Sequence, residues 1–132
     1  MKTIEVVAGI IFDKDKVFAT QRGYGNYKGW WEFPGGKLEA GEIPQDALKR
    51  ELREELQIEI EVKDFIKTVE CVYPEYKVIL HCYEAQIVAG EPVLLEHMSS
   101  RWLNAEELHN LMWLKSDLEV LDDIQKIMLD RR

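Results

Sequence analysis

A group of glutamates within residues 50–56, "RELREEL", is the first feature that suggests chemistry. On a helix, Glu51, Glu54 and Glu55 share one face, with Cβ atoms roughly 5–6 Å apart. Glu51 and Glu55 repel each other at this spacing unless a cation is present. Hard oxygen donors suit Mg²⁺, which keeps waters that substrate phosphates can displace. The alternative is an ordinary solvated helix face in which Arg50 pairs with Glu54.

The segment before these glutamates, "EFPGGKLEAGE" at residues 32–42, is suited to an anionic ligand. Adjacent glycines, Gly35 and Gly36, let the backbone bend closely around a ligand, and Lys37 and Glu42 follow them. A loop that leads into the first turn of a helix favours phosphate binding. Loop and helix together therefore indicate a phosphate-containing ligand held with divalent cations.

The spacing of these residues resembles a known family. Gly36 is followed after five residues by Glu42, after seven more by Arg50-Glu51-Leu52-x-Glu54-Glu55, and then by the aliphatic Ile58. This pattern is similar to the Nudix box of the Nudix hydrolases. Six fixed residue types at one placement arise by chance with a frequency on the order of 10⁻⁷ or less. "WEFPGGKLEAGE" and "IEVVAGII" also resemble the MutT branch, especially its CTP pyrophosphohydrolase members.

Two positions depart from the family pattern. Gln57 stands where the family usually has glycine, and a non-glycine in a left-handed conformation there costs about 1–2 kcal/mol. Ile43 replaces the hydroxyl residue common before the proline, which removes a helix cap worth roughly 1 kcal/mol. These departures concern the two ends of the helix and leave the predicted chemistry in place.

The resemblance implies a role for each residue of the motif. Glu51, Glu54 and Glu55 would bind Mg²⁺, or alternatively Mn²⁺, with the carbonyl of Gly35. Arg50 would orient a glutamate. The loop and the start of the helix would be supported by Gly36 and Glu42.

The general base has two candidates. One is Glu51. The other is Glu96 in "LLEHMSSRW", because some relatives use an acid before the last short strand as a metal ligand or base; a surface loop acid is the alternative. His97 beside it is interpreted as incidental.

Residues that bind substrate are predicted on both sides of the motif. Arg22 and Lys37 are candidates for phosphate contacts, since Arg binds phosphate oxygens in a bidentate manner and Lys supplies a compact charge. The alternative for either is a solvated surface base. Phe33 is a candidate for stacking on a base, although the core is an equally good place for it. The resemblance implies Tyr76, Lys77 and Asp117 as further contacts with the base; for Asp117 the alternative is an acid that only favours the dipole of the last helix.

The elements that must position these residues follow from hydrophobic periodicity. Strands are predicted at 3–12, 17–22, 58–73, 76–88 and 99–103, with a flexible loop at 23–29. A helix is expected from Pro44 to Leu56, with Ala47, Leu48, Leu52 and Leu56 on its buried side. Two capping boxes, Asn104 with Glu107 and Ser116 with Glu119, predict a short and a longer final helix. This order predicts the α/β (α+β) class and, by resemblance, a Nudix-type α/β/α sandwich with a mixed sheet.

Bulk properties limit the partners. The chain has 132 residues, 46% of them apolar and 32% charged, which indicates a single domain over residues 1–132. A net charge of −8 argues against binding a nucleic-acid polymer through a basic face. No segment has the pattern of a secretion signal or a membrane span, so a cytoplasmic location is expected. Cys71 and Cys82 lack metal-site spacing and are expected to be free thiols.

These observations predict a Mg²⁺-dependent enzyme that hydrolyses a nucleoside triphosphate to a monophosphate and pyrophosphate, acting as a monomer or homodimer. Oxidised nucleotides are candidate substrates. Cytosine is the preferred base if Asp117 accepts a hydrogen bond from its amino group, since a carboxylate only accepts. The alternatives are hydrolysis of another nucleoside diphosphate linked to a moiety X, and a non-catalytic sensing module. The sensing module predicts a broken glutamate set, which is not seen; a prenyl diphosphate isomerase would need a catalytic cysteine near the motif.

Overall fold

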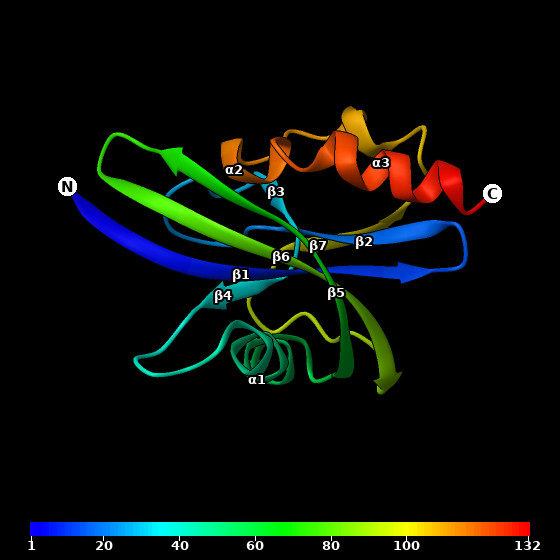
Figure 1. The fold of residues 1–132 in the computed structure, drawn as a ribbon, viewed down its shortest axis with the longest axis horizontal. Coiled ribbons are helices and arrows are strands. Elements are labelled where there is room, and N and C mark those ends of the chain that lie inside the picture. The colour runs from blue at the N-terminus through cyan, green and yellow to red at the C-terminus, as the bar shows by residue number, and fades with distance from the viewer.

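The structure, a computed structural model, describes all residues 1–132 and places a mixed β-sheet between two helical layers (Figure 1). Helix α1 (Pro44–Leu56) covers one face, and α2 (Lys115–Leu118), α3 (Leu121–Asp130) and the 3₁₀ turn η1 (Leu108–Asn110) cover the other. The strands are β1 (Lys2–Asp13), β2 (Lys16–Gln21), β3 (Trp31–Glu32), β4 (Gly35–Lys37), β5 (Glu59–Val72), β6 (Tyr76–Ala89) and β7 (Ser99–Leu103). The predicted sandwich with a mixed sheet is confirmed.

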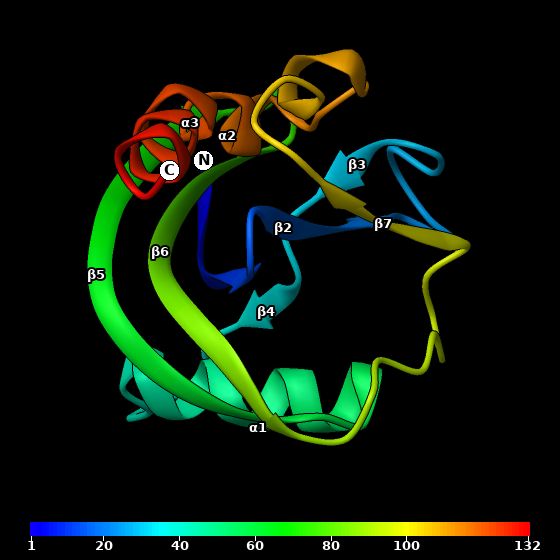
Figure 2. The same cartoon turned by 90° about the vertical axis from the view of Figure 1, so that its right-hand side faces the viewer.

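The sheet is mixed because β1 pairs with β6 in parallel, whereas its other pairings are antiparallel. Its main path runs β3-β2-β1-β6-β5, with β4 paired to β1 and β7 paired to β2. Figure 2 shows β5 and β6 bending together in a long arc. Register irregularities occur between Val62 and Phe65 and between Phe65 and Lys67, and bulges of this kind bend a strand.

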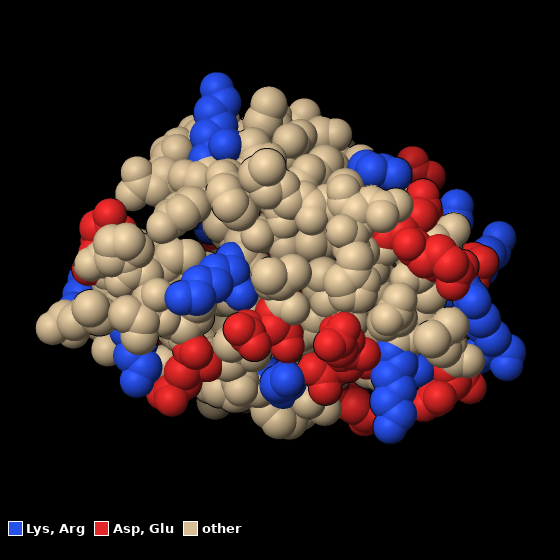
Figure 3. Space-filling model, turned by 90° about the horizontal axis from the view of Figure 1, so that it is seen from above, with Lys and Arg blue, Asp and Glu red and all other residues tan.

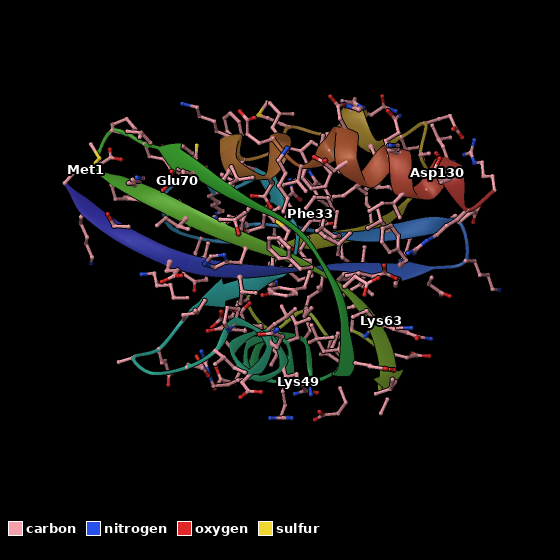
Figure 4. All side chains as sticks on the ribbon, viewed as in Figure 1. Met1, Phe33, Lys49, Lys63, Glu70 and Asp130 are labelled. Atoms are coloured by element: carbon pink, nitrogen blue, oxygen red, sulfur yellow. The ribbon has the colours of Figure 1, made fainter.

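Both faces of the sheet are buried, which explains the nearly continuous apolar run of β1. Ala8 and Ile10 point toward α2 and α3, while Val7 and Ile11 point toward α1. Figure 4 shows Phe33 in the interior, between the sheet and the α2–α3 layer, while Lys49 and Lys63 lie at the periphery. Both cysteines are free and buried, as expected.

Helix α1 has the predicted bounds and the predicted buried side. Ala47, Leu48, Leu52 and Leu56 are each 0% exposed and pack against the sheet. Full burial of a leucine side chain contributes about 1.5–3 kcal/mol, so this stripe fixes the rotation of α1 about its axis. The same rotation determines which glutamates of α1 point toward the loop that precedes it.

The C-terminal region differs from its prediction. Asn104 and Glu107 form the expected reciprocal cap, with bonds of 2.9 and 3.0 Å, but only η1 follows it. The predicted cap by Ser116 and Glu119 is wrong. The hydroxyl and backbone N–H of Ser116 both bond to the Tyr73 hydroxyl in the interior, at 3.0 and 3.1 Å, so Ser116 lies inside α2 and does not begin a longer helix.

Charged side chains are unevenly spread over the surface. Seen from above, the centre of the view is largely uncharged, and acidic and basic side chains gather along its left, lower and right edges (Figure 3). The helices of the structure lack the combination of length and apolar character that a membrane-spanning helix needs.

Candidate functional site

An open cavity of about 500 Å³ lies against β1, β4 and β6 and is bordered by residues of the 22–27, 96–97 and 114–117 segments. It brings together most of the residues predicted from sequence. The predicted site residues that line it are Arg22, Phe33, Gly35, Gly36, Lys37, Glu51, Glu55, Tyr76, Glu96 and Asp117. Those outside its lining are Glu42, Arg50, Glu54 and Lys77.

Arg50 ties the loop before α1 to the glutamates on the helix. Its guanidinium donates to both carboxylate oxygens of Glu42, at 2.8 and 2.9 Å, and to the Lys37 carbonyl at 3.1 Å. It also donates to Glu51 at 2.9 Å and to Glu54 at 3.3 Å. The bonds from Arg50 lower the pKa of Glu42 to about 2, which keeps this carboxylate ionised. Arg50 thus contacts Glu51 directly and joins Glu42 to α1, while the roles suggested for Arg50 and Glu42 stay predictions.

Gly35 and Gly36 permit the close approach between this loop and its neighbours. A Cβ on Gly35 would collide with the Val7 carbonyl on β1, and a Cβ on Gly36 would collide with the Glu51 carboxylate. A larger residue at Gly35 would push this segment away from β1, and one at Gly36 would push it away from Glu51 on α1. The glycines therefore allow Glu51 to lie directly against the loop.

Three carboxylates, those of Glu51, Glu55 and Glu96, define one end of the cavity. Burial, followed by the charges of Glu51, Glu96 and Glu32, raises the pKa of Glu55 to about 8. Burial also raises the pKa of Glu51, although Arg50 opposes this. Without a counterion, neighbouring buried acids resist ionising together, and a bound cation would relieve this repulsion.

Glu54 does not join this group. Its side chain is 59% exposed and is directed toward Arg50. As the side chains stand, no three acidic, histidine or cysteine residues are gathered closely enough to enclose an ion. The predicted convergence of Glu51, Glu54 and Glu55 on one point is therefore absent from this arrangement, because Arg50 attracts Glu54 and Glu51 while Glu55 faces the cavity.

The opposite end of the cavity is aromatic and contains Asp117, which is only 4% exposed. Its carboxyl group accepts hydrogen bonds from the Phe33 backbone N–H at 2.9 Å and the Ser116 hydroxyl at 3.2 Å. Burial, with a contribution from the Glu32 charge, raises the pKa of Asp117 from 3.8 to about 7. Near pH 7 a substantial fraction is a neutral acid that can also donate a hydrogen bond. The premise that this group only accepts does not hold at neutral pH.

Of the other residues predicted to contact the base, two line the cavity and one does not. Phe33 is 3% exposed and stacks on Trp113 with ring centroids 4.6 Å apart, so it is mainly a core residue with one edge on the cavity. Tyr76 lines the cavity and stacks on Tyr73 at 5.4 Å. Lys77 is not brought to the cavity, because side chains alternate along β6, and it pairs with Glu70 at 3.1 Å.

Comparison with known proteins identifies the family of the chain. The sequence matches the NUDIX domain over residues 2–124. The chain belongs to the Nudix hydrolase family. It is 35% identical over 123 residues to the CTP pyrophosphohydrolase of Escherichia coli K12, covering 92% of this chain and 91% of that relative.

Further relatives have similar coverage. A putative 8-oxo-dGTP diphosphatase 2 of Mycobacterium tuberculosis is 33% identical over 125 residues, covering 93% of this chain and 89% of the relative. The crystal structure of a MutT Nudix hydrolase from Burkholderia pseudomallei superimposes with a TM-score of 0.85 at 21% identity, covering 94% of this chain and 99% of that one. The likeness to the Burkholderia pseudomallei structure shows a shared fold.

In this Nudix hydrolase the chemistry of the donors at the acidic end fits a divalent metal. Glu51, Glu55 and Glu96 supply hard oxygen ligands within one cavity. Burial raises the pKa of both Glu51 and Glu55, and the charges of Glu51 and Glu96 add to the rise at Glu55; a bound cation would offset both effects. Glu54, exposed at the rim, can reach such an ion only by changing its rotamer. The Gly35 carbonyl belongs to the same part of the cavity wall.

Several cavity residues of this Nudix hydrolase were not predicted as site residues. Glu32 holds Arg22 through bonds of 3.0 and 3.2 Å, so the Arg22 guanidinium faces a carboxylate as well as the cavity. Tyr24, in the glycine-rich loop, donates to Glu96 at 3.4 Å. His97, interpreted as incidental from sequence, also lines the cavity. Glu32, on β3, and His97, just before β7, reach the cavity because β3 and β7 both pair with β2. Hydrophobic periodicity could not predict this pairing, because β3 has only two residues.

Proposed function

We propose that this protein is a Mg²⁺-dependent pyrophosphohydrolase that converts a nucleoside triphosphate to the monophosphate and pyrophosphate. The observation that carries the proposal is the two-ended cavity, with carboxylates at one end and aromatic side chains with Asp117 at the other. A nucleotide has the same division, because its polyphosphate requires cations and its base requires a stacking surface. One substrate can therefore occupy both ends.

At the acidic end, we assign metal binding, positioning and proton removal to different residues. Glu51, Glu55 and Glu96, with Glu54 and the Gly35 carbonyl, would hold the metal. Bound divalent cations neutralise phosphate charge and lower the pKa of a coordinated water. Arg50 keeps Glu51 against the loop through its 2.9 Å bond. Glu51 and Glu96 are the two candidates for the base that removes a proton from the attacking water.

The aromatic end sets the preferred base. The named activities of the two relatives concern CTP and 8-oxo-dGTP, and both bases carry an amino group that can donate to a carboxylate. We place Asp117 opposite this amino group, with cytosine nucleotides as the preferred substrates. Tyr76 and the exposed edge of Phe33 would flank the base.

A panel of natural and 8-oxo nucleoside triphosphates, assayed for pyrophosphate release with Mg²⁺, tests the proposal. Nucleotide sugars and dinucleoside polyphosphates belong in the same panel. Glu51→Gln and Glu54→Gln are each expected to lower turnover about a hundredfold, since removing one charge from a metal site weakens stabilisation of the transition state. Glu61→Gln, an exposed acid on β5, is the matched control and should be unchanged. Release of pyrophosphate from no triphosphate, or full activity of Glu51→Gln, would refute the proposal.

A further inference from the structure

Tyr27 has a backbone conformation that is unusual for a bulky residue. Its φ is 66°, in the left-handed region, where the Cβ atom of an L-residue approaches the following carbonyl oxygen too closely. The other non-glycine residues with positive φ are Lys14, in the turn between β1 and β2, and Gln57, at the end of α1. Of these residues, Tyr27 alone lines the cavity.

Hydrogen bonds close to Tyr27 hold its loop in this shape. The Tyr27 carbonyl accepts from the Trp30 N–H at 3.0 Å. The two ends of the loop are joined where Arg22 donates to the Trp30 carbonyl and accepts from the Gly29 N–H, both at 2.8 Å. Strained residues persist where the surrounding structure determines them, and they cluster at sites that bind ligands. The loop therefore keeps the Tyr27 ring in one place at a cost in backbone free energy.

The Tyr27 ring belongs to the aromatic end of the cavity. It meets the Tyr73 ring at an angle of 63°, with centroids 5.4 Å apart. Tyr73 stacks in turn on Tyr76. The Tyr73 hydroxyl bonds to Ser116, which precedes Asp117 in the chain. Tyr27 is only partly buried in spite of its contact with the core, so its ring has surface left for a ligand in the cavity.

We propose that the Tyr27 ring contacts the nucleobase of the substrate and forms one wall of the base site. This inference rests on the proposed function. Every base has a π face, so contact with an aromatic ring stabilises a bound nucleotide without selecting among bases. Asp117, by contrast, acts on the polar edge of the base. Tyr27 therefore contributes affinity for all nucleotides, whereas Asp117 contributes to the choice between them.

Steady-state kinetics with CTP, UTP and GTP test this contact. Tyr27→Asn removes the ring, and asparagine tolerates the left-handed conformation. For each of these nucleotides that wild type hydrolyses, we expect KM to rise about tenfold with kcat nearly unchanged, as for loss of one stacking contact remote from the reacting phosphates. Tyr27→Phe is the conservative variant, and its ring should restore most of the affinity. Lys14→Asn, at a left-handed position outside the cavity, is the control and should keep the wild-type KM.

Melting curves of the same variants separate substrate binding from a purely structural role. A ring that only packs on Tyr73 would lower Tm in Tyr27→Asn and leave KM unchanged, and this result would overturn the inference. A rise in KM for one base alone would also overturn it. Tyr27→Leu, which keeps apolar bulk against Tyr73 but has no π face, should also raise KM, and it provides the comparison if Tyr27→Asn does not fold.

A binding experiment distinguishes failure of this inference from failure of the proposed function. If wild type hydrolyses no nucleoside triphosphate, the proposed function fails, and calorimetric titration with CMP, UMP and GMP decides the contact. We expect Kd for these monophosphates to be about tenfold higher in Tyr27→Asn than in wild type. Equal Kd values in the two proteins, or no binding by wild type, would overturn the contact.

Discussion

Asp117 makes the stability of this protein depend on pH in a direction opposite to that of most acids. Its pKa rises from 3.8 to about 7 on folding, so the folded state keeps a proton that the unfolded chain has already lost between these values. Stability from this group is complete below about pH 4, falls as pH rises, and reaches its lowest value above about pH 7. The whole rise corresponds to about 4 kcal/mol, at 1.36 kcal/mol for each tenfold change in proton affinity.

The substitution Asp117→Asn isolates this effect. Asparagine retains an oxygen that can accept from the Phe33 N–H or the Ser116 hydroxyl, but it carries no charge at any pH. The variant is therefore expected to exceed wild type in free energy of unfolding by a few kcal/mol at pH 8.5 and by much less at pH 4.5. Exposure of 4% leaves little solvent to screen the charge, so no large discount applies.

Urea unfolding followed by tryptophan fluorescence at intervals between pH 4.5 and 8.5 measures the difference. Other titrating groups act equally on both proteins and cancel in the comparison. A difference between wild type and Asp117→Asn that stays constant across this range would refute the reasoning, because it would mean that Asp117 titrates alike in the folded and unfolded states.

Mg²⁺ at a hundred times its Kd is expected to raise the free energy of unfolding by about 2.7 kcal/mol, or the Tm by about 10 °C. The reason is that the cation offsets repulsion between Glu51 and Glu55. Coincident melting curves in EDTA and in Mg²⁺ would contradict this expectation. Gln57→Gly should raise the free energy of unfolding by about 0.5–1 kcal/mol, since Gln57 has φ 57° and glycine avoids the left-handed cost, whereas Gln57→Ala should give no gain. The CTP/UTP ratio of kcat/KM should rise by up to about ninefold between pH 6 and 8, because the ionised fraction of Asp117 grows from about 10% to about 90% across its pKa of about 7. A ratio that does not change with pH would show that other residues recognise the base.

The helix with its motif was predictable because several independent signals coincide there. Pro44 at the start and leucines at one-turn intervals agree, so α1 has its predicted bounds. The helix ends in a left-handed residue even though Gln57 replaces the usual glycine, and it begins at Ile43 without a side-chain cap. The long strands follow from β-branched runs. The motif spacing then identifies the family. All motif residues lie on one helix and the loop before it, so their relative positions depend only on local geometry.

Predictions failed where tertiary contacts outweigh local pattern. Ser116 has the spacing of a cap, yet the Tyr73 hydroxyl from the distant β5–β6 turn engages it. Glu54 shares a helix face with Glu51, but Arg50 holds it at the rim. Helical spacing gives the direction of a Cβ atom, whereas the rotamer that aims a carboxylate depends on partners elsewhere in the chain.

Asp117 shows why base preference does not follow from residue type alone. As a carboxylate it would favour the amino group of cytosine, but as a neutral acid it can also donate to the carbonyl of uracil. Which form is present depends on burial among aromatic side chains and on Glu32, which Arg22 holds nearby. Arg22 and Glu32 are brought together by the pairing of β2 with β3. The selectivity of the aromatic end is therefore a property of the folded cavity, and a change at Glu32 or Arg22 should alter it through the protonation of Asp117.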